Sequence, residues 1–300
     1  MRVYLLFLLY ILTLMALAAA VLPWTHPTLF ATVGLTPESS LYRSAMLAAL
    51  LCMPLFLRFL RLDSWAAAGF AAPRGMGWRS LGKGFAAGCL ILGVLATVQW
   101  AAGIQHLAVS PEREGLPYLI RSLLSGAVSG LAVGLIEETF FRGLMHTGMR
   151  RSLGFWPTAL LTGLLYGVVH FVKPVPPGGG PLTSAEAFGM LAGGLARLGE
   201  PAAFADSLVT LVVAGVFLSM VRERTGSIVW AIGIHAGWVM VIKVFKHLTD
   251  PTVVGGQTSP WIGSGYDSVT GWMATIWLGA LAAVYWWAGR GPTPRVSGKT

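Results

Sequence analysis

Two adjacent glutamates and an arginine lie inside an apolar run where a membrane-spanning helix is expected. The stretch GLIEETFFRG at 134–143 places Glu137, Glu138 and Arg142 in that run. A charged side chain at membrane depth costs a few kcal/mol or more, so it normally faces the protein interior or a wet cavity. These three residues are therefore the first candidates for chemistry.

Helical spacing separates the two glutamates. Glu138 and Arg142 are four residues apart with the glutamate first, which is the favourable order for an ion pair that lowers the cost of burying both charges. Glu137 is rotated by about 100° from Glu138 and can face a different partner. A glutamate in a low-dielectric environment is suited to accept and return protons, which is the task of a general base.

Two histidines, His170 in YGVVHF and His235 in IGIHAGWVM, also fall inside apolar runs. Residues 118–146 and 155–172 are joined by a short connection, so we expect an antiparallel hairpin that sets Glu137 and His170 at similar heights, roughly 20–25 Å from the turn. His235, about 12 Å from Ser227, agrees less closely in depth. Two histidines near Glu137 could orient a water molecule, share its proton or bind a metal. The other histidines lie at or near the ends of runs and are expected to be solvated: His26, His106, His146 and His247.

Composition shows what must position these residues. The chain is 55% hydrophobic and 11% charged, with a mean hydropathy of +0.69, which indicates a membrane protein. A helix needs about 20 mainly apolar residues to cross the hydrocarbon. We predict an all-α polytopic membrane protein, one domain over 1–300 with about eight transmembrane helices in one bundle. The predicted spans are 3–22, 41–62, 84–105, 118–146, 155–172, 206–221, 227–246 and 269–288.

Basic residues set the expected orientation. The net charge of +9 does not indicate nucleic-acid binding, because most Lys and Arg residues fall in segments on one side of the predicted bundle, the pattern expected of cytoplasmic loops. Both termini are then cytoplasmic, and we expect the plasma (inner) membrane. The first run could be a signal peptide, but its length favours an uncleaved helix. The residues on the predicted inner side are Arg2, Arg58, Arg61, Arg74, Arg79, Lys83, Arg142, Arg150, Arg151, Arg222, Arg224, Arg290, Arg295 and Lys299.

Small residues and prolines predict local packing. Glycines at 126, 130 and 134, and at 163 and 167, allow close helix approach, so we expect 118–146 and 155–172 to pack tightly together. The loop at 173–205 begins KPVPPGGGP, which cannot continue a helix. A short interfacial helix is expected in the rest of this loop, either as a lid or substrate entrance or as a surface connector.

Three motifs resemble those of the CPBP intramembrane proteases, the group that contains type II CAAX prenyl endopeptidases and bacteriocin-processing or immunity proteins. EETFFR matches the EExxxR motif, and YGVVH resembles FxxxH with Tyr166 in place of phenylalanine. HAGWV resembles the third motif, a histidine followed four residues later by Asn or Asp. The resemblance covers roughly 118–246, which we take as the catalytic core, with additional N-terminal transmembrane helices over 1–105.

The resemblance implies hydrolysis of a peptide bond within the membrane. Glu137 would activate water, with His170 and His235 orienting it, while Glu138 and Arg142 would hold the helix and tune Glu137. One position departs from the family pattern. Val239 stands four residues after His235, where the family has Asn or Asp, and the chain contains no asparagine. The family's asparagine positions water or stabilises the tetrahedral intermediate, so here Arg142, a backbone amide or a hydroxyl must do so, or the role is unfilled. Loss of one oxyanion donor typically lowers the rate about 10²–10³-fold.

Three alternative functions are consistent with these residues and motifs. The first is an endopeptidase acting on a membrane-anchored, lipidated or amphipathic peptide in the bilayer, with no cofactor and with zinc as the alternative to a metal-free mechanism. The second is a non-catalytic scaffold or immunity-type protein of the same fold, favoured by Val239. The third is a proton-coupled transporter, which predicts broken helices and paired repeats that the sequence does not display.

Overall fold

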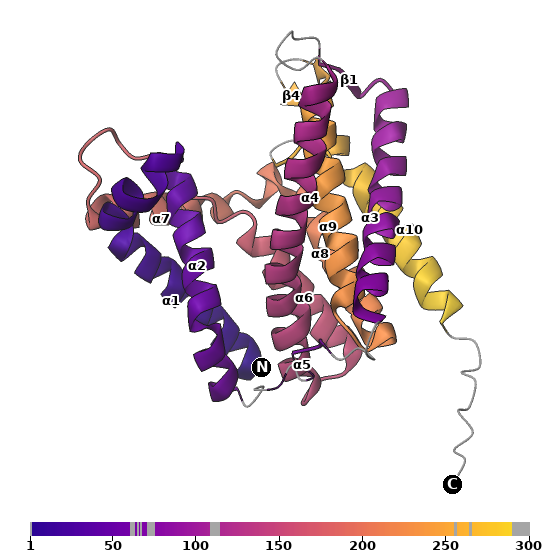
Figure 1. Cartoon of the computed structure of the whole chain (residues 1–300), viewed down its shortest axis with the longest axis horizontal. Helices are drawn as coiled ribbons and strands as arrows, with labels where there is room; N and C mark the ends of the chain where they lie inside the picture. Colours follow the sequence, from indigo (N-terminus) through magenta and orange to yellow (C-terminus); the bar gives the residue numbers. More distant parts are fainter. Residues whose placement is uncertain are drawn as a thin grey trace.

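The protein is almost entirely helical over the residues that the structure describes (Figure 1). The computed structural model describes residues 2–60, 64, 66, 68–70, 76–108, 115–254, 257–263 and 266–289. The helices are α1 (Arg2–Thr25), α2 (Pro37–Phe59), α3 (Met76–Ala101), α4 (Leu116–Glu138), α5 (His146–Arg150), α6 (Phe155–Val169), α7 (Ser184–Ala196), α8 (Ala205–Thr225), α9 (Val229–Leu248) and α10 (Trp272–Ala288). Two antiparallel strand pairs lie at one end: β1 (Gln105–Leu107) with β2 (Thr249–Pro251), and β3 (Val253–Val254) with β4 (Gln257–Thr258).

Long apolar helices confirm the predicted fold class, an all-α polytopic membrane protein. Within the described residues, six helical segments are long and apolar enough to cross a membrane: Arg2–Phe30, Pro37–Phe59, Gly77–Ala101, Leu116–Arg150, Ala205–Thr225 and Val229–Leu248. Phe155–Val169 and Trp272–Ala288 are apolar but shorter, so the predicted count of eight spans is not confirmed. The predicted orientation depends partly on Arg61, Arg74, Arg290, Arg295 and Lys299, which lie outside the described residues.

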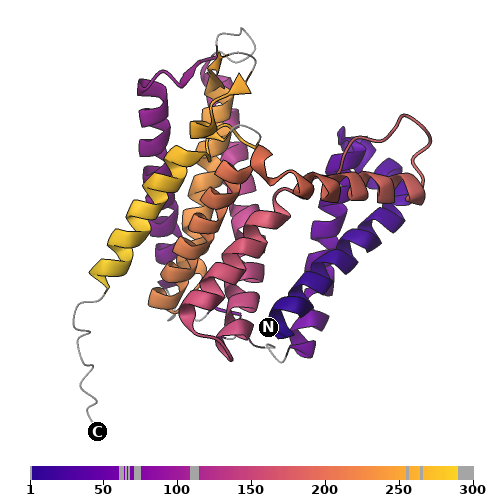
Figure 2. The ribbon, with the colours of Figure 1, turned by 180° about the vertical axis from the view of Figure 1, so that it is seen from behind.

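The first two helices form a pair set apart from the other helices, and α7 lies across them (Figures 1 and 2). Ala18, Ala19 and Leu22 of α1 are buried against Ala187 and Met190 of α7. The α7 helix confirms the short helix predicted within 173–205. Because α7 packs on α1, the segment 173–205 belongs to the part of the molecule formed by the N-terminal pair, beside the central helices.

The pair touches the centre of the molecule at its N-terminal end. The Phe7 ring of α1 lies 5.0 Å from the Phe140 ring, edge to face, and Tyr10 stacks on Phe56 of α2 at 4.1 Å. Such aromatic pairs stabilise the contact beyond what the burial of their apolar surface contributes.

Glycines decide which central helices approach closely, and one expectation is wrong. A Cβ at Gly126, Gly130 or Gly134 would meet Met240, Ala236 or Ile232 of α9, so the α4 glycines face α9. Those of α6 face α8, because a Cβ at Gly163 would meet Val212 and one at Gly167 would meet Leu208. The predicted tight packing of 118–146 against 155–172 does not occur along α4. Helix α6 instead contacts the continuation of α4.

That continuation is not a regular α-helix. Helix α4 ends at Glu138 and is followed by a π-helical segment, η4 (Thr139–Met145), before α5 begins at His146. A π-helix is rare, widens the helix locally and occurs often at functional sites. Here it begins one residue after the glutamate pair and includes Arg142.

Candidate active site

Glu138 lies at the centre of a buried polar network. Its Oε1 atom is 2.9 Å from Nη1 of Arg142, and both side chains are 0% exposed. The same Oε1 atom is 2.8 Å from Nδ1 of His235 on α9. The ion pair predicted from the four-residue spacing is therefore present. Since Nδ1 of His235 donates to a carboxylate, its Nε2 atom is the one available elsewhere.

Glu137 faces both histidines. Its Oε2 atom lies 3.6 Å from Nε2 of His170 and 3.8 Å from Nε2 of His235. His170 caps the C-terminus of α6, where its Nδ1 atom lies 2.6 Å from the carbonyl oxygen of Tyr166 and donates to it. Both rings are thus fixed through Nδ1, and both direct Nε2 toward one carboxylate. The expected similarity in height of Glu137 and His170 is confirmed, and His235 joins them.

Aromatic rings cover the buried guanidinium. The central carbon of the Arg142 guanidinium lies 4.4 Å from the Tyr166 ring centroid and 5.8 Å from that of Phe141. A cation over an aromatic face is attracted by the ring quadrupole, more strongly where water is excluded. The aromatic ring at position 166 therefore supports Arg142, while its backbone orients His170.

Two cavities meet at Glu137. The first, of about 130 Å³, is mainly apolar and lies between the N-terminal pair and the centre. The second, of about 260 Å³, lies among the central helices and contains more polar side chains. Both are lined by Tyr42, Glu137 and His170. The second also contacts His235 and Val239. A carboxylate shared by an apolar cavity and one with several polar side chains can reach a substrate that has both kinds of group.

Sequence reasoning missed three residues that line the second cavity: Tyr42 of α2, and Tyr266 and Asp267 of the segment before α10. None of them lies within the three motifs. Tyrosine near the end of an apolar helix is also typical of a membrane interface. Only the fold brings these residues together with Glu137.

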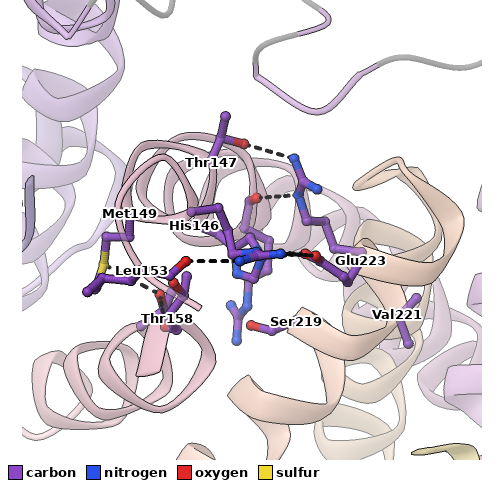
Figure 3. Close-up of polar contacts among 12 residues, drawn as sticks. His146, Thr147, Met149, Leu153, Thr158, Ser219, Val221 and Glu223 are labelled. Atoms are coloured by element: carbon purple, nitrogen blue, oxygen red, sulfur yellow. Dashed lines mark hydrogen bonds and ion pairs between the residues drawn. The ribbon is translucent and has the colours of Figure 1, made fainter. Parts of the chain in front are cut away.

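His146 is the clearest correction among the other histidines (Figure 3). It is 0% exposed, with Nε2 at 3.1 Å from Oε2 of Glu223 on α8, so the expectation that it is solvated is wrong. Glu223 also binds Arg150, with 2.7 Å between Oε1 and Nη2. The π-helical segment continues the chain as a helix beyond Arg142 and brings His146 against α8. His106 and His247 are exposed as expected, and His26 is half-buried, 2.9 Å from Ser40.

The described side chains do not form a ready-made metal site. Across the part of the chain that the structure describes, no group of three or more His, Cys, Asp and Glu side chains is arranged to hold a metal ion. Nε2 of His170 and Nε2 of His235 lie 3.6 and 3.8 Å from Oε2 of Glu137. Zinc thus stays an alternative for experiment to decide.

Comparison with known families agrees with the motif resemblance. The family model described as type II CAAX prenyl endopeptidase Rce1-like matches residues 119–241, which include all five candidate site residues. No curated protein and no solved structure gives a significant match. The match confirms the resemblance and, with the apolar helices, supports an integral membrane protease of the CAAX type at the level of the family. Helices α1, α2, α3 and α10 lie outside the matched residues.

Proposed function

We propose that this protein is an intramembrane endopeptidase that hydrolyses a peptide bond in a membrane-tethered or lipidated substrate. The observation that carries the proposal is the convergence of Nε2 of His170 and Nε2 of His235 on one carboxylate oxygen of Glu137, 3.6 and 3.8 Å away. Such separations suit a water molecule shared among the three side chains. Glu137 is the general base, and the two histidines orient the water.

Glu137 alone carries the proton that is transferred during the reaction. It takes one proton from the water as the water oxygen bonds to the scissile carbonyl carbon, and the carbonyl oxygen becomes an oxyanion. When the C–N bond breaks, Glu137 returns the proton to the departing nitrogen, leaving a carboxyl group and an amine. Glu138 and Arg142 do not need to exchange protons in this scheme, and they keep His235 in the orientation that the reaction needs.

The cavities support a lipidated substrate. The first cavity is walled by apolar side chains of α1 and α2, among them Ile11, Leu14 and Met53, and it ends at Glu137 and His170. An apolar chain in this cavity would set an attached peptide beside the base. The family match suggests a prenylated peptide as the substrate class.

Cleavage by the purified full-length protein in detergent tests the proposal, with prenylated, acylated and unmodified amphipathic peptides as substrates. General-base catalysis contributes about 10²–10⁴-fold, so Glu137→Gln is expected to lower kcat by that factor, and His170→Ala by a similar one. Glu200→Gln, at an exposed position in the loop after α7, is the matched control and is expected to retain wild-type activity. Wild-type rates in Glu137→Gln would refute the proposal.

The scaffold alternative is favoured by one observation, because Val239 brings a hydrocarbon side chain to the cavity wall where the family pattern has an amide or acid. It predicts that the wild type binds a lipidated peptide without cleaving it, and that Glu137→Gln binds equally well. A chelator distinguishes the zinc alternative. Activity lost on chelation and restored by zinc would make the histidines metal ligands.

A further inference from the structure

The departure at Val239 raises the question of which group stabilises the oxyanion. A tetrahedral intermediate needs donors aimed at the oxygen that becomes charged. Val239 lines the second cavity and offers no donor. Arg142 is not among the residues that line this cavity, and its guanidinium lies behind the Tyr166 ring.

Two of the hydroxyls at this cavity are already engaged. Thr210 Oγ1 lies 3.0 Å from the Asp206 carbonyl, 2.9 Å from the Gly271 carbonyl and 2.6 Å from Thr275 Oγ1. Thr270 Oγ1 donates to Oδ1 of Asp267 at 2.8 Å. Neither threonine has a proton left for a substrate oxygen. The remaining hydroxyls on the wall belong to three tyrosines, Tyr42, Tyr166 and Tyr266.

Resting on the proposed function, we propose that Tyr266, on the wall of the second cavity, is the oxyanion donor that replaces the missing amide of the third motif. Tyr166 is only 3% exposed and is packed between Arg142 and Phe141. Tyr42 is 41% exposed and also lines the apolar cavity, so its side chain is divided between the two cavities. Tyr266 is the tyrosine that lies on the polar side of Glu137.

The surroundings of Tyr266 hold its ring near His170, on the wall of the cavity that Glu137 also lines. Its centroid lies 6.2 Å from that of His170 and 5.2 Å from that of Phe171. Nζ of Lys173 lies over the Tyr266 ring, 4.3 Å from its centroid. A cation over an aromatic face is attracted by the ring quadrupole, so Lys173 helps to hold the Tyr266 ring in place.

The phenol also keeps its proton. Burial raises the pKa of Tyr266 above its usual value, and the negative charges of Asp267 and Glu137 raise it further. The hydroxyl is therefore neutral at physiological pH and can donate a hydrogen bond. As water adds to the carbonyl carbon and Glu137 takes its proton, the C=O electron pair moves to oxygen, and Tyr266 donates to that oxygen without transferring its proton. When the C–N bond breaks, the carbonyl re-forms and the hydrogen bond weakens.

Single-oxygen substitutions test the assignment, measured on the full-length protein in detergent with a prenylated peptide. Loss of one oxyanion donor lowers kcat by about 10²–10³-fold, so Tyr266→Phe is expected to show that loss with KM unchanged. Val239→Asn introduced into Tyr266→Phe is expected to recover much of the rate, because it returns an amide donor to the same cavity. A purely structural role for Tyr266 would not be rescued in this way.

The other phenols give the comparison. Tyr285→Phe is the matched control, because Tyr285 lies on α10 beside Phe217 and Arg224, away from the two cavities, and it is expected to retain wild-type kcat. Wild-type kcat in Tyr266→Phe would overturn the assignment, as would a loss confined to Tyr42→Phe or Tyr166→Phe. Glu137→Gln in the same series reports on the proposed function separately. If it is inactive while Tyr266→Phe is fully active, only the oxyanion assignment fails.

Discussion

A single methyl group at Gly134 tests whether the close approach of α4 and α9 sets the geometry of the candidate site. Gly134 lies about one turn before Glu137 and faces α9. A Cβ there would be 2.9 Å from the carbonyl oxygen of Ile232, 3.3 Å from the backbone nitrogen of Ala236 and 3.6 Å from Cβ of His235. Ordinary contacts of a Cβ begin at 3.4 Å. Because the nearest atoms are backbone, Gly134→Ala requires the two helices to separate by about 0.5 Å.

This separation acts directly on the histidine of α9. Nε2 of His235 is 3.8 Å from Oε2 of Glu137, and the change adds to that distance. A misplacement of 1 Å can lower a rate about 10²-fold, so half of it is expected to lower kcat/KM about tenfold. Overpacking destabilises by about 1–3 kcal/mol, while alanine is favoured over glycine in a helix by about 1 kcal/mol. The net change in stability is then about 0–2 kcal/mol.

The assay is peptide cleavage together with thermal unfolding in the same detergent. Gly279→Ala is the matched control, since a Cβ at this glycine of α10 would have nothing within 4 Å. It is expected to keep wild-type kcat/KM. Unchanged cleavage in Gly134→Ala would refute the link between helix separation and activity, and so would an equal loss in Gly279→Ala.

Three further substitutions and treatments follow from the buried network. Arg142→Met leaves the Glu138 carboxylate buried without its cation, so the free energy of unfolding should fall by about 3–5 kcal/mol, measured by thermal or denaturant unfolding. His146→Leu removes the contact with Glu223 and should lower the free energy of unfolding by about 1–3 kcal/mol. Cleavage per folded molecule should stay at the wild-type level, and a catalytic defect in folded protein would contradict this. Chelation by EDTA is expected to leave cleavage unchanged, and a loss that zinc reverses would contradict the metal-free mechanism.

The helices and the pair of charges could be predicted because each depends on local sequence. The length of an apolar run sets the length of a span, and the four-residue spacing of Glu138 and Arg142 brings their side chains together whatever the rest of the fold. The motif residues could be named from their types and order. The division into a core over 118–246 and additional helices over 1–105 stays a prediction, as do the membrane and the orientation.

Which helices pack against each other across the bundle could not be predicted from residue types alone. A row of glycines shows that another helix comes close but does not say which one, so Gly126 and Gly130 were assigned to the wrong neighbour. The expectation that His146 is solvated is wrong because it rests on the end of the apolar run 118–146, whereas the helix continues there through η4 and α5, and Glu223 of α8 contacts the ring. Tyr266 lies far along the chain from Glu137, and no spacing rule connects them.

The two adjacent glutamates have different partners, so each can have a different role. Glu138 Oε1 receives both Arg142 and His235, so its charge is compensated and its role is to hold a histidine in place. Oε2 of Glu137 is buried and has no hydrogen-bond partner among the described residues. Leaving a buried polar atom unpaired costs about 1–3 kcal/mol. Oε2 of Glu138 is likewise buried without a partner among these residues, so the two glutamates differ in their other contacts. Glu138 is held by Arg142 and His235, whereas Glu137 faces Nε2 of His170 and of His235 at 3.6 and 3.8 Å, which is the arrangement that the proposed base requires.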